Sequence, residues 1–209
     1  MPKLRILGLI LSLFGGPALA APTKILVFGD SLVSGYGIRD GEAFPTLLGQ
    51  RLQADGYDVV IANAGVPGNT TAMGLARASL AAAGKPDLVI LELGINDLLN
   101  NVELHKTRNN LVRLIHRFRR SGARVILAGM IADDRRGAAY KQAFDALYPA
   151  LASKYALPLY PHFLDGVAND PAYTQEGGLH PNAEGVRAIV ARFAPLVERV
   201  LDDMGAKPK

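Results

Sequence analysis

The sequence predicts an α/β protein, a three-layer α/β/α sandwich built around a parallel sheet of five strands. Short apolar runs, of the length of buried strands, alternate along the chain with longer segments whose apolar residues recur at helical spacing. Polar segments that contain glycine follow several of the apolar runs. The alternation favours right-handed crossovers, which bring the ends of the strands to one edge of the sheet.

The five apolar runs are predicted to be the strands. They are continuous rather than alternating with polar residues, which is typical of strands that are buried on both faces of a parallel sheet. The five runs are residues 25–28, 59–62, 88–93, 125–128 and 157–160.

Four helices are predicted from stripes of apolar residues between and after these runs. The first covers residues 44–52, the second covers residues 104–118, and the third spans about 140–155. The fourth is predicted to open at Pro181, because proline is favoured at the first position of a helix, and to continue through residue 193.

The amino-terminal segment has the pattern of a secretory signal. Lys3 and Arg5 precede a short apolar run at residues 6–14, and small residues follow it. We therefore expect residues 1–21 to be a signal peptide and residues 22–209 to form a single domain, with a retained membrane anchor as the alternative. The apolar run is too short to span a bilayer comfortably, so no stable membrane insertion is expected after cleavage.

Charge and cysteine content exclude several classes of function. The formal net charge of +4 falls to +2 once Lys3 and Arg5 are removed, which gives no case for binding nucleic acid. Arg117, Arg119 and Arg120 do cluster, but they lie near the end of a predicted helix, where cations interact favourably with the helix dipole. The chain has no cysteine, which excludes a cysteine nucleophile, a cysteine zinc site and disulfide bonds. We expect a monomer, held together by its hydrophobic core and binding no nucleic acid.

Four segments expected at the carboxyl edge of the sheet carry the chemistry of acyl transfer. Ser31 follows the first strand, and its hydroxyl needs a base such as His180, which precedes the last helix. Gly68, after the second strand, lets the backbone approach a ligand closely. Asn96, after the third strand, can donate through its side-chain amide to a developing oxyanion, as can the backbone N–H of Ser31.

Each of these residues also has an ordinary structural interpretation. Ser31 could be a helix cap, Gly68 a turn glycine, and His180 a loop histidine bonded to backbone. His162, after the fifth strand, is a rival base. No histidine pair has metal-ligand spacing, and no phosphate-binding glycine motif follows a strand, which argues against a metal site and against a nucleotide or flavin module.

Four sequence blocks in order resemble the SGNH (GDSL) hydrolase family, and most closely its bacterial periplasmic acyl-CoA thioesterase, lysophospholipase and arylesterase subgroup. The resemblance implies a flavodoxin-like sandwich with no metal and no organic cofactor. It places the nucleophile on Ser31, the general base on His180, and the oxyanion hole on Ser31, Gly68 and Asn96. The four blocks are G-D-S-L at 29–32, G-N-T at 68–70, G-I-N-D at 94–97 and L-H-P-N at 179–182.

The sequence departs from the family pattern at one position. The family usually has aspartate three residues before the histidine, and here that position is Gly177. Glu176 could orient the imidazole from a shifted loop, or a backbone carbonyl could do so in a Ser-His dyad. We expect a secreted or periplasmic serine esterase or thioesterase that acts on small acyl esters through an acyl-serine intermediate. The alternative is a weak or inactive acyl- or glycan-binding protein.

Overall fold

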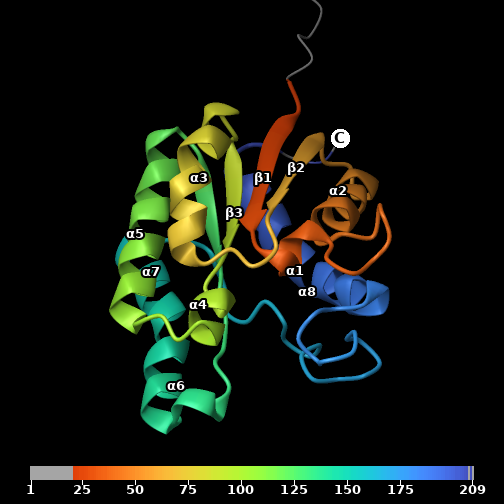
Figure 1. Ribbon diagram of the computed structural model, residues 1–209. Helices are drawn as coiled ribbons and strands as arrows, with labels where there is room; N and C mark the ends of the chain where they lie inside the picture. Colours follow the sequence, from red (N-terminus) through yellow and green to blue (C-terminus); the bar gives the residue numbers. More distant parts are fainter. Residues whose placement is uncertain (1–20, 207, 209) are drawn as a thin grey trace, which may run out of the picture.

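The computed structural model describes residues 21–206 and residue 208, and it has the predicted α/β/α architecture (Figure 1). The predicted signal peptide lies almost entirely outside these residues. All strand pairs are parallel, and the sheet has the order β2-β1-β3-β4-β5, which is the flavodoxin-like order. The strands are β1 (Thr23–Gly29), β2 (Val59–Gly65), β3 (Leu88–Glu92), β4 (Arg124–Ala128) and β5 (Leu159–Tyr160).

Helices cover both faces of the sheet. In Figure 1, α3, α5 and α7 lie on one side of the strands, and α2 and α8 lie on the other. Within the described residues the helices are α1 (Ser31–Ser34), α2 (Phe44–Ala54), α3 (Thr71–Ala83), α4 (Ile95–Leu99), α5 (Leu104–Arg120), α6 (Ala138–Asp145), α7 (Leu147–Tyr155) and α8 (Ala183–Asp203), with a short 3₁₀ turn, η1 (Asp134–Arg136).

The hydrophobic core has one layer on each side of the sheet. On one side Phe28 of β1 packs edge-on against Phe118 of α5, with 5.0 Å between ring centroids. On the other side Phe44 of α2 packs against Phe193 of α8 at 5.3 Å. Every residue of β3 is buried, as its continuous apolar run predicts.

The predicted helix over residues 140–155 is two helices. α6 and α7 meet at Ala146, and Pro149 lies in the first turn of α7. Proline has no N–H with which to bond the carbonyl of Asp145, so a regular helix cannot run through this point. The sequence pattern also failed to indicate α3, because its small residues give only a weak apolar stripe.

The last helix begins later than predicted. α8 starts at Ala183, and its N-cap is Asn182, whose side chain accepts a hydrogen bond from the Gly185 N–H at 2.9 Å. Pro181 lies outside the helix and pairs in an antiparallel bridge with Thr174. The Asn182 side chain satisfies a helix N–H that would otherwise have no acceptor, and this cap sets the start of the helix at Ala183.

The register of the strands places their carboxyl ends side by side. Gly29 of β1 pairs with Gly65 of β2, and Glu92 of β3 pairs with Ala128 of β4. A Cβ atom on Gly65 would lie 2.4 Å from the backbone nitrogen of Ser34, so a glycine is needed for the end of β2 to pack against α1. The segments that follow the strands therefore converge at one edge.

Among the helices of the described residues, none combines the length and the apolar content that crossing a bilayer requires.

Candidate active site

Ser31 is the first residue of α1, immediately beyond the buried end of β1. The N-cap of this helix is Asp30, not Ser31, and its carboxylate accepts a hydrogen bond from the Leu32 N–H at 3.0 Å. The Ser31 side chain is therefore not used for capping. It is half-buried at the carboxyl edge of the sheet and free to meet another group.

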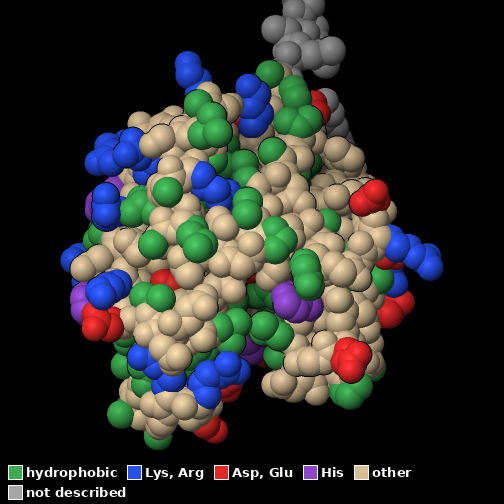
Figure 2. Space-filling model, in the orientation of Figure 1, with side chains coloured by type: hydrophobic (Ala, Val, Ile, Leu, Met, Phe, Trp, Pro, Cys, Tyr) green, Lys and Arg blue, Asp and Glu red, His purple; other side chains and the backbone are tan. Residues whose placement is uncertain are grey.

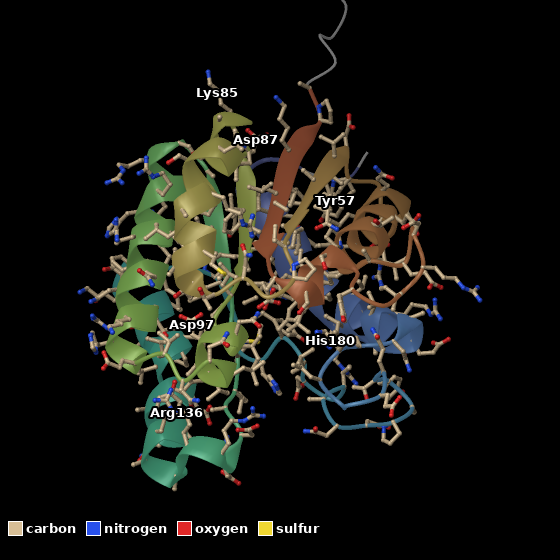
Figure 3. All side chains as sticks on the ribbon, in the orientation of Figure 1. Tyr57, Lys85, Asp87, Asp97, Arg136 and His180 are labelled. Carbon is tan, nitrogen blue, oxygen red and sulfur yellow. The ribbon has the colours of Figure 1, made fainter. Side chains whose placement is uncertain are left out.

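That group is His180, whose Nε2 lies 3.0 Å from Ser31 Oγ. Figure 3 shows His180 near the start of α8, beyond the carboxyl ends of the strands. A neutral imidazole protonated at Nδ1 can accept the serine proton at Nε2. The structure thus brings together two residues that are separated by 149 positions in the chain.

The loop that carries His180 is held by Gln175. The Gln175 backbone N–H donates to the His180 carbonyl at 2.8 Å, and its side chain donates to the carbonyls of Tyr36 and Pro181. The Tyr36 ring lies against the imidazole, with 4.9 Å between centroids. Sequence reasoning missed both Tyr36 and Gln175, although both lie within a few residues of the blocks that it singled out.

Among the described residues, no acidic side chain orients the imidazole. Gly177 is exposed with a φ of +94°, and the Glu176 side chain is also exposed and has no hydrogen bond to His180. Within residues 21–206, His180 Nδ1 has no hydrogen-bond partner. Burial lowers the pKa of His180 below its usual value of 6.5, with no carboxylate to raise it again.

The two backbone N–H groups of the predicted oxyanion hole, those of Ser31 and Gly68, are without a hydrogen bond to another described residue. Gly68 has a φ of +77°, a conformation that favours glycine, and nothing lies within 4 Å of the place a Cβ would take.

The Asn96 amide is already engaged. Its Nδ2 donates to Asp30 Oδ2 at 2.9 Å and to the Asn69 carbonyl at 3.2 Å. An amide nitrogen has only two hydrogens, so an oxyanion would have to replace one of these acceptors. The bond to the Asn69 carbonyl is the longer of the two and is the one that would be exchanged.

Asp97 is a structural residue rather than part of the reacting group. Its buried carboxylate accepts from the Thr71 backbone N–H at 2.7 Å, from the Thr71 hydroxyl at 2.5 Å and from the Thr107 hydroxyl at 3.0 Å. These bonds tie α4 to the first turns of α3 and α5, on the side of the site away from His180 (Figure 3).

Arg77 of α3 braces the loop that contains Gly68. Its guanidinium donates to Asn69 Oδ1 at 2.7 Å, to the Ala64 carbonyl at 2.9 Å and to the Gly29 carbonyl at 2.8 Å. One side chain therefore links the ends of β1 and β2 with the loop that follows β2. Nothing in the sequence pattern singles out this arginine from the other cations.

A cleft lies near His180, although neither Ser31 nor His180 is among its lining residues. The face in Figure 2 is hollowed between α6 and the loop that precedes α8, and His180 borders the hollow. The cleft has a volume of about 230 Å³, and its lining includes neighbours in sequence of both Asn96 and His180. Its apolar walls include Leu98, Leu99, Ile131, Leu164, Ala168 and Leu179.

His162, the rival base, lines this cleft instead of contacting the serine. Its Nδ1 lies 3.9 Å from Asp165 Oδ1, and no contact with Ser31 is found. The geometry therefore favours His180 as the partner of Ser31.

The chain is similar to known ester hydrolases. The sequence profile of the GDSL-like lipase/acylhydrolase family matches residues 27–188. An arylesterase of Vibrio mimicus is 36% identical over 182 residues, which cover 87% of this chain and 91% of the relative. The thioesterase 1/protease 1/lysophospholipase L1 of Escherichia coli K12 is 34% identical over 166 residues, which cover 79% of this chain and 78% of that relative.

A solved structure supports the same relationship. The crystal structure of TesA superimposes on this chain with a TM-score of 0.81 and 34% sequence identity. The match covers 86% of this chain and 100% of the TesA chain.

An aspartate at position 177 should raise the pKa of His180. Gly177→Asp introduces a carboxylate on the loop before the imidazole, and an adjacent negative charge favours the protonated ring. The substitution strains a backbone with positive φ by about 1–2 kcal/mol. Gly177→Asn has the same strain without the charge and is the matched control. NMR titration of the His180 ring should show the upward shift only in the aspartate variant; equal titration of both variants would contradict it.

Proposed function

The chain belongs to the GDSL-like lipase/acylhydrolase family and is an ester hydrolase, and we propose that it acts through an acyl-serine intermediate on Ser31. The observation that carries this proposal is the 3.0 Å contact between Ser31 Oγ and His180 Nε2. The alternative of an inactive acyl- or glycan-binding protein has no support from the named relatives, which are esterases and thioesterases.

The reaction follows from the contact between the two side chains. Ser31 Oγ bonds to the acyl carbon while its proton passes to His180 Nε2, and the leaving oxygen or sulfur then takes that proton. Water attacks the acyl-serine, gives a proton to His180, and the acid is released as the proton returns to Ser31. Because burial keeps the pKa of His180 below 6.5, the imidazole stays a base down to slightly acidic pH.

The oxyanion is held by donors from three segments. The backbone N–H groups of Ser31 and Gly68 have no protein partner among the described residues, so they need no rearrangement to bind it. Asn96 becomes the third donor by exchanging its 3.2 Å bond to the Asn69 carbonyl for the oxyanion. Its other N–H stays on Asp30, which holds the amide in place during the exchange.

The enzyme works as a Ser-His dyad. In a serine protease, replacing the triad aspartate by asparagine lowers turnover about 10⁴-fold, because the imidazole is left in the wrong tautomer. Here Nδ1 has no partner that imposes a wrong tautomer, and the ring position is supported by Tyr36 and by the Gln175 bond to the His180 carbonyl. A modest turnover is therefore expected.

The substrate is a small acyl ester or thioester whose acyl group enters the cleft along its apolar walls, away from Asp133, Arg135 and His162. A cavity of about 150 Å³ is enough to bind benzene, and the cleft of about 230 Å³ has room for an aryl or a medium-length acyl group. Arylesterase, thioesterase and lysophospholipase are the activities in the names of the relatives, and a shared acyl-serine mechanism serves all three.

The chain acts outside the cytoplasm, as a monomer. The support for export is the pattern of Lys3 and Arg5 before the apolar run at residues 6–14. N-terminal sequencing of the exported protein should find cleavage near Ala20 or Ala21, and recovery of the uncleaved chain in membranes would contradict export by a signal peptide.

Removing the nucleophile should abolish activity and leave the fold intact. Ser31→Ala is expected to lower kcat for p-nitrophenyl acetate by as much as roughly 10⁶-fold, the loss seen when subtilisin loses its serine. Ser34→Ala is the control, because that hydroxyl lies one turn later in α1 and only donates to the Ser31 carbonyl at 3.3 Å. Wild-type turnover by Ser31→Ala would refute the assignment.

A larger side chain in the cleft should shorten the preferred acyl chain. Ala168→Phe fills part of the cleft and is expected to lower kcat/KM for p-nitrophenyl octanoate about tenfold relative to acetate, the effect of losing one or two methylene contacts. Ala81→Phe, in a separate hollow beside β1 and β2, is the control. Equal loss on both esters would argue against the cleft as the acyl site.

A further inference from the structure

Glu92 is a buried acid that the mechanism above does not use. It is the last residue of β3, and its side chain is fully buried. Oε2 accepts a hydrogen bond from the Asp30 backbone N–H at 3.2 Å. Oε1 has no hydrogen-bond partner among the residues that the structure describes. A buried polar atom without a partner is rare in folded proteins and calls for a physical explanation.

No described cation neutralises this acid. Arg77, the nearest candidate, donates its three hydrogen bonds to Asn69 and to the carbonyls of Ala64 and Gly29. An ionised carboxylate without a cation is strongly disfavoured in a protein interior, so Glu92 carries a proton. A protonated carboxyl group has an O–H to donate, and the acceptor beside it belongs to Asp30, whose backbone nitrogen lies 3.2 Å from Glu92 Oε2.

The proton belongs to Glu92 and the negative charge to Asp30, because the donors around the pair are unequal. The Asp30 carboxylate accepts from the Leu32 N–H at 3.0 Å and from the Asn96 amide at 2.9 Å. Glu92 accepts only from the Asp30 backbone N–H. Two N–H donors stabilise the charged form of the carboxyl group at which they point.

The backbone leaves room for this pair. A Cβ atom on Gly29 would lie 2.4 Å from Glu92 Oε2 and 2.7 Å from the Glu92 carbonyl oxygen. Any other residue at position 29 would therefore displace the carboxyl group. The glycine before Asp30 and Ser31 serves to seat the Glu92 side chain under the turn that carries the serine.

We propose that Glu92 is a positioning residue of the ester hydrolase: its neutral carboxyl group donates to Asp30 and holds that carboxylate where it fixes both the Asn96 amide and the first turn of α1. The inference rests on the proposed function, since it concerns the donors and the nucleophile assigned there. Loss of the Glu92 O–H would leave the Asp30 carboxylate with one donor fewer and free to turn away from Asn96.

The charges that face the pair agree with this distribution of protons. Burial raises the pKa of Asp30 to about 6 and raises the pKa of Glu92 well above its usual value, which is the direction that a proton held on Glu92 requires. The other facing groups are Arg77 of α3, which favours the Asp30 charge, Asp97 of α4, which opposes it, and the buried Tyr148 of α7, whose hydroxyl donates to the Leu93 carbonyl.

Two substitutions at Glu92 test the proposal. Glu92→Gln keeps an N–H donor for Asp30 and an acceptor for its backbone N–H, so kcat should stay close to that of the wild type. Glu92→Leu has a similar shape and neither group; kcat for p-nitrophenyl acetate should fall roughly 100-fold with KM nearly unchanged, the size of effect that a 1 Å misplacement produces. Rescue by glutamine separates positioning from a need for packing volume.

Glu198, which is half-buried and lies 3.9 Å from Arg51 Nη2, provides a control on another element. It lies on α8, its pKa is also raised by burial, and its Oε1 likewise has no hydrogen-bond partner among the described residues. Glu198→Leu should leave kcat unchanged, because its carboxyl group has no contact with Asp30. An equal fall of kcat in Glu198→Leu and Glu92→Leu would overturn the proposal.

The proton itself can be observed without any loss of folding. The infrared difference spectrum between the wild type and Glu92→Gln at neutral pH should contain the carbonyl stretch of one un-ionised carboxyl group. The spectrum keeps the proposal testable if Glu92→Leu does not fold. A carboxylate band in its place would overturn the proposal, as would wild-type kcat in a folded Glu92→Leu variant.

Failure of this inference can be told from failure of the proposed function. Diethyl p-nitrophenyl phosphate should phosphorylate Ser31 in the wild type, as mass spectrometry of the modified peptide would detect. If Ser31 is labelled and Glu92→Leu turns over normally, only the role of Glu92 is wrong. If another residue is labelled and activity is lost, the nucleophile is wrong and the inference falls with it.

Discussion

The Asp30 carboxylate is the group around which the site is organised. It lies at the buried end of β1 and accepts hydrogen bonds from the Leu32 N–H, which starts the helix of Ser31, and from the Asn96 amide of a neighbouring strand end. A buried carboxylate is tolerated only where such donors surround it, and a hydrogen bond to a charged group contributes about 1.5–3 kcal/mol. The same charge that caps a four-residue helix thus also sets the distance between the serine and the Asn96 amide.

The strand ends supply most of what the chemistry needs, and the sheet supplies their alignment. Because β1 pairs with both β2 and β3 in parallel, the segments after these three strands emerge at the same edge. The turn after β1 provides Ser31, the loop after β2 provides Gly68, and α4 after β3 provides Asn96. Arg77 and Asp97 then tie these segments together with hydrogen bonds to backbone and hydroxyl groups.

Fewer contacts position His180 than position the residues at the strand ends. His180 comes from the loop before α8, outside the sheet, and it is placed by the Gln175 backbone bond and by the Tyr36 ring. With glycine at position 177 and an exposed Glu176, no acid raises the affinity of the imidazole for a proton. Burial alone lowers the pKa of His180; in its proposed role as base this keeps the ring neutral and able to accept a proton, but stabilises the imidazolium less than a triad does.

The sequence by itself determined the fold class and the residues with reactive chemistry. Continuous apolar runs can only be buried strands or buried helix segments, and the polar blocks after them carried Ser31, Gly68, Asn96 and His180. It misplaced the start of α8 and the break before α7, because these depend on an Asn182 cap and on Pro149. Only the tertiary structure decided that Asp30 caps α1 and holds Asn96, that Glu92 lies beneath Asp30, and that Tyr36 meets His180. Apart from the cap, these are contacts between residues far apart in the chain, which a local sequence pattern cannot predict.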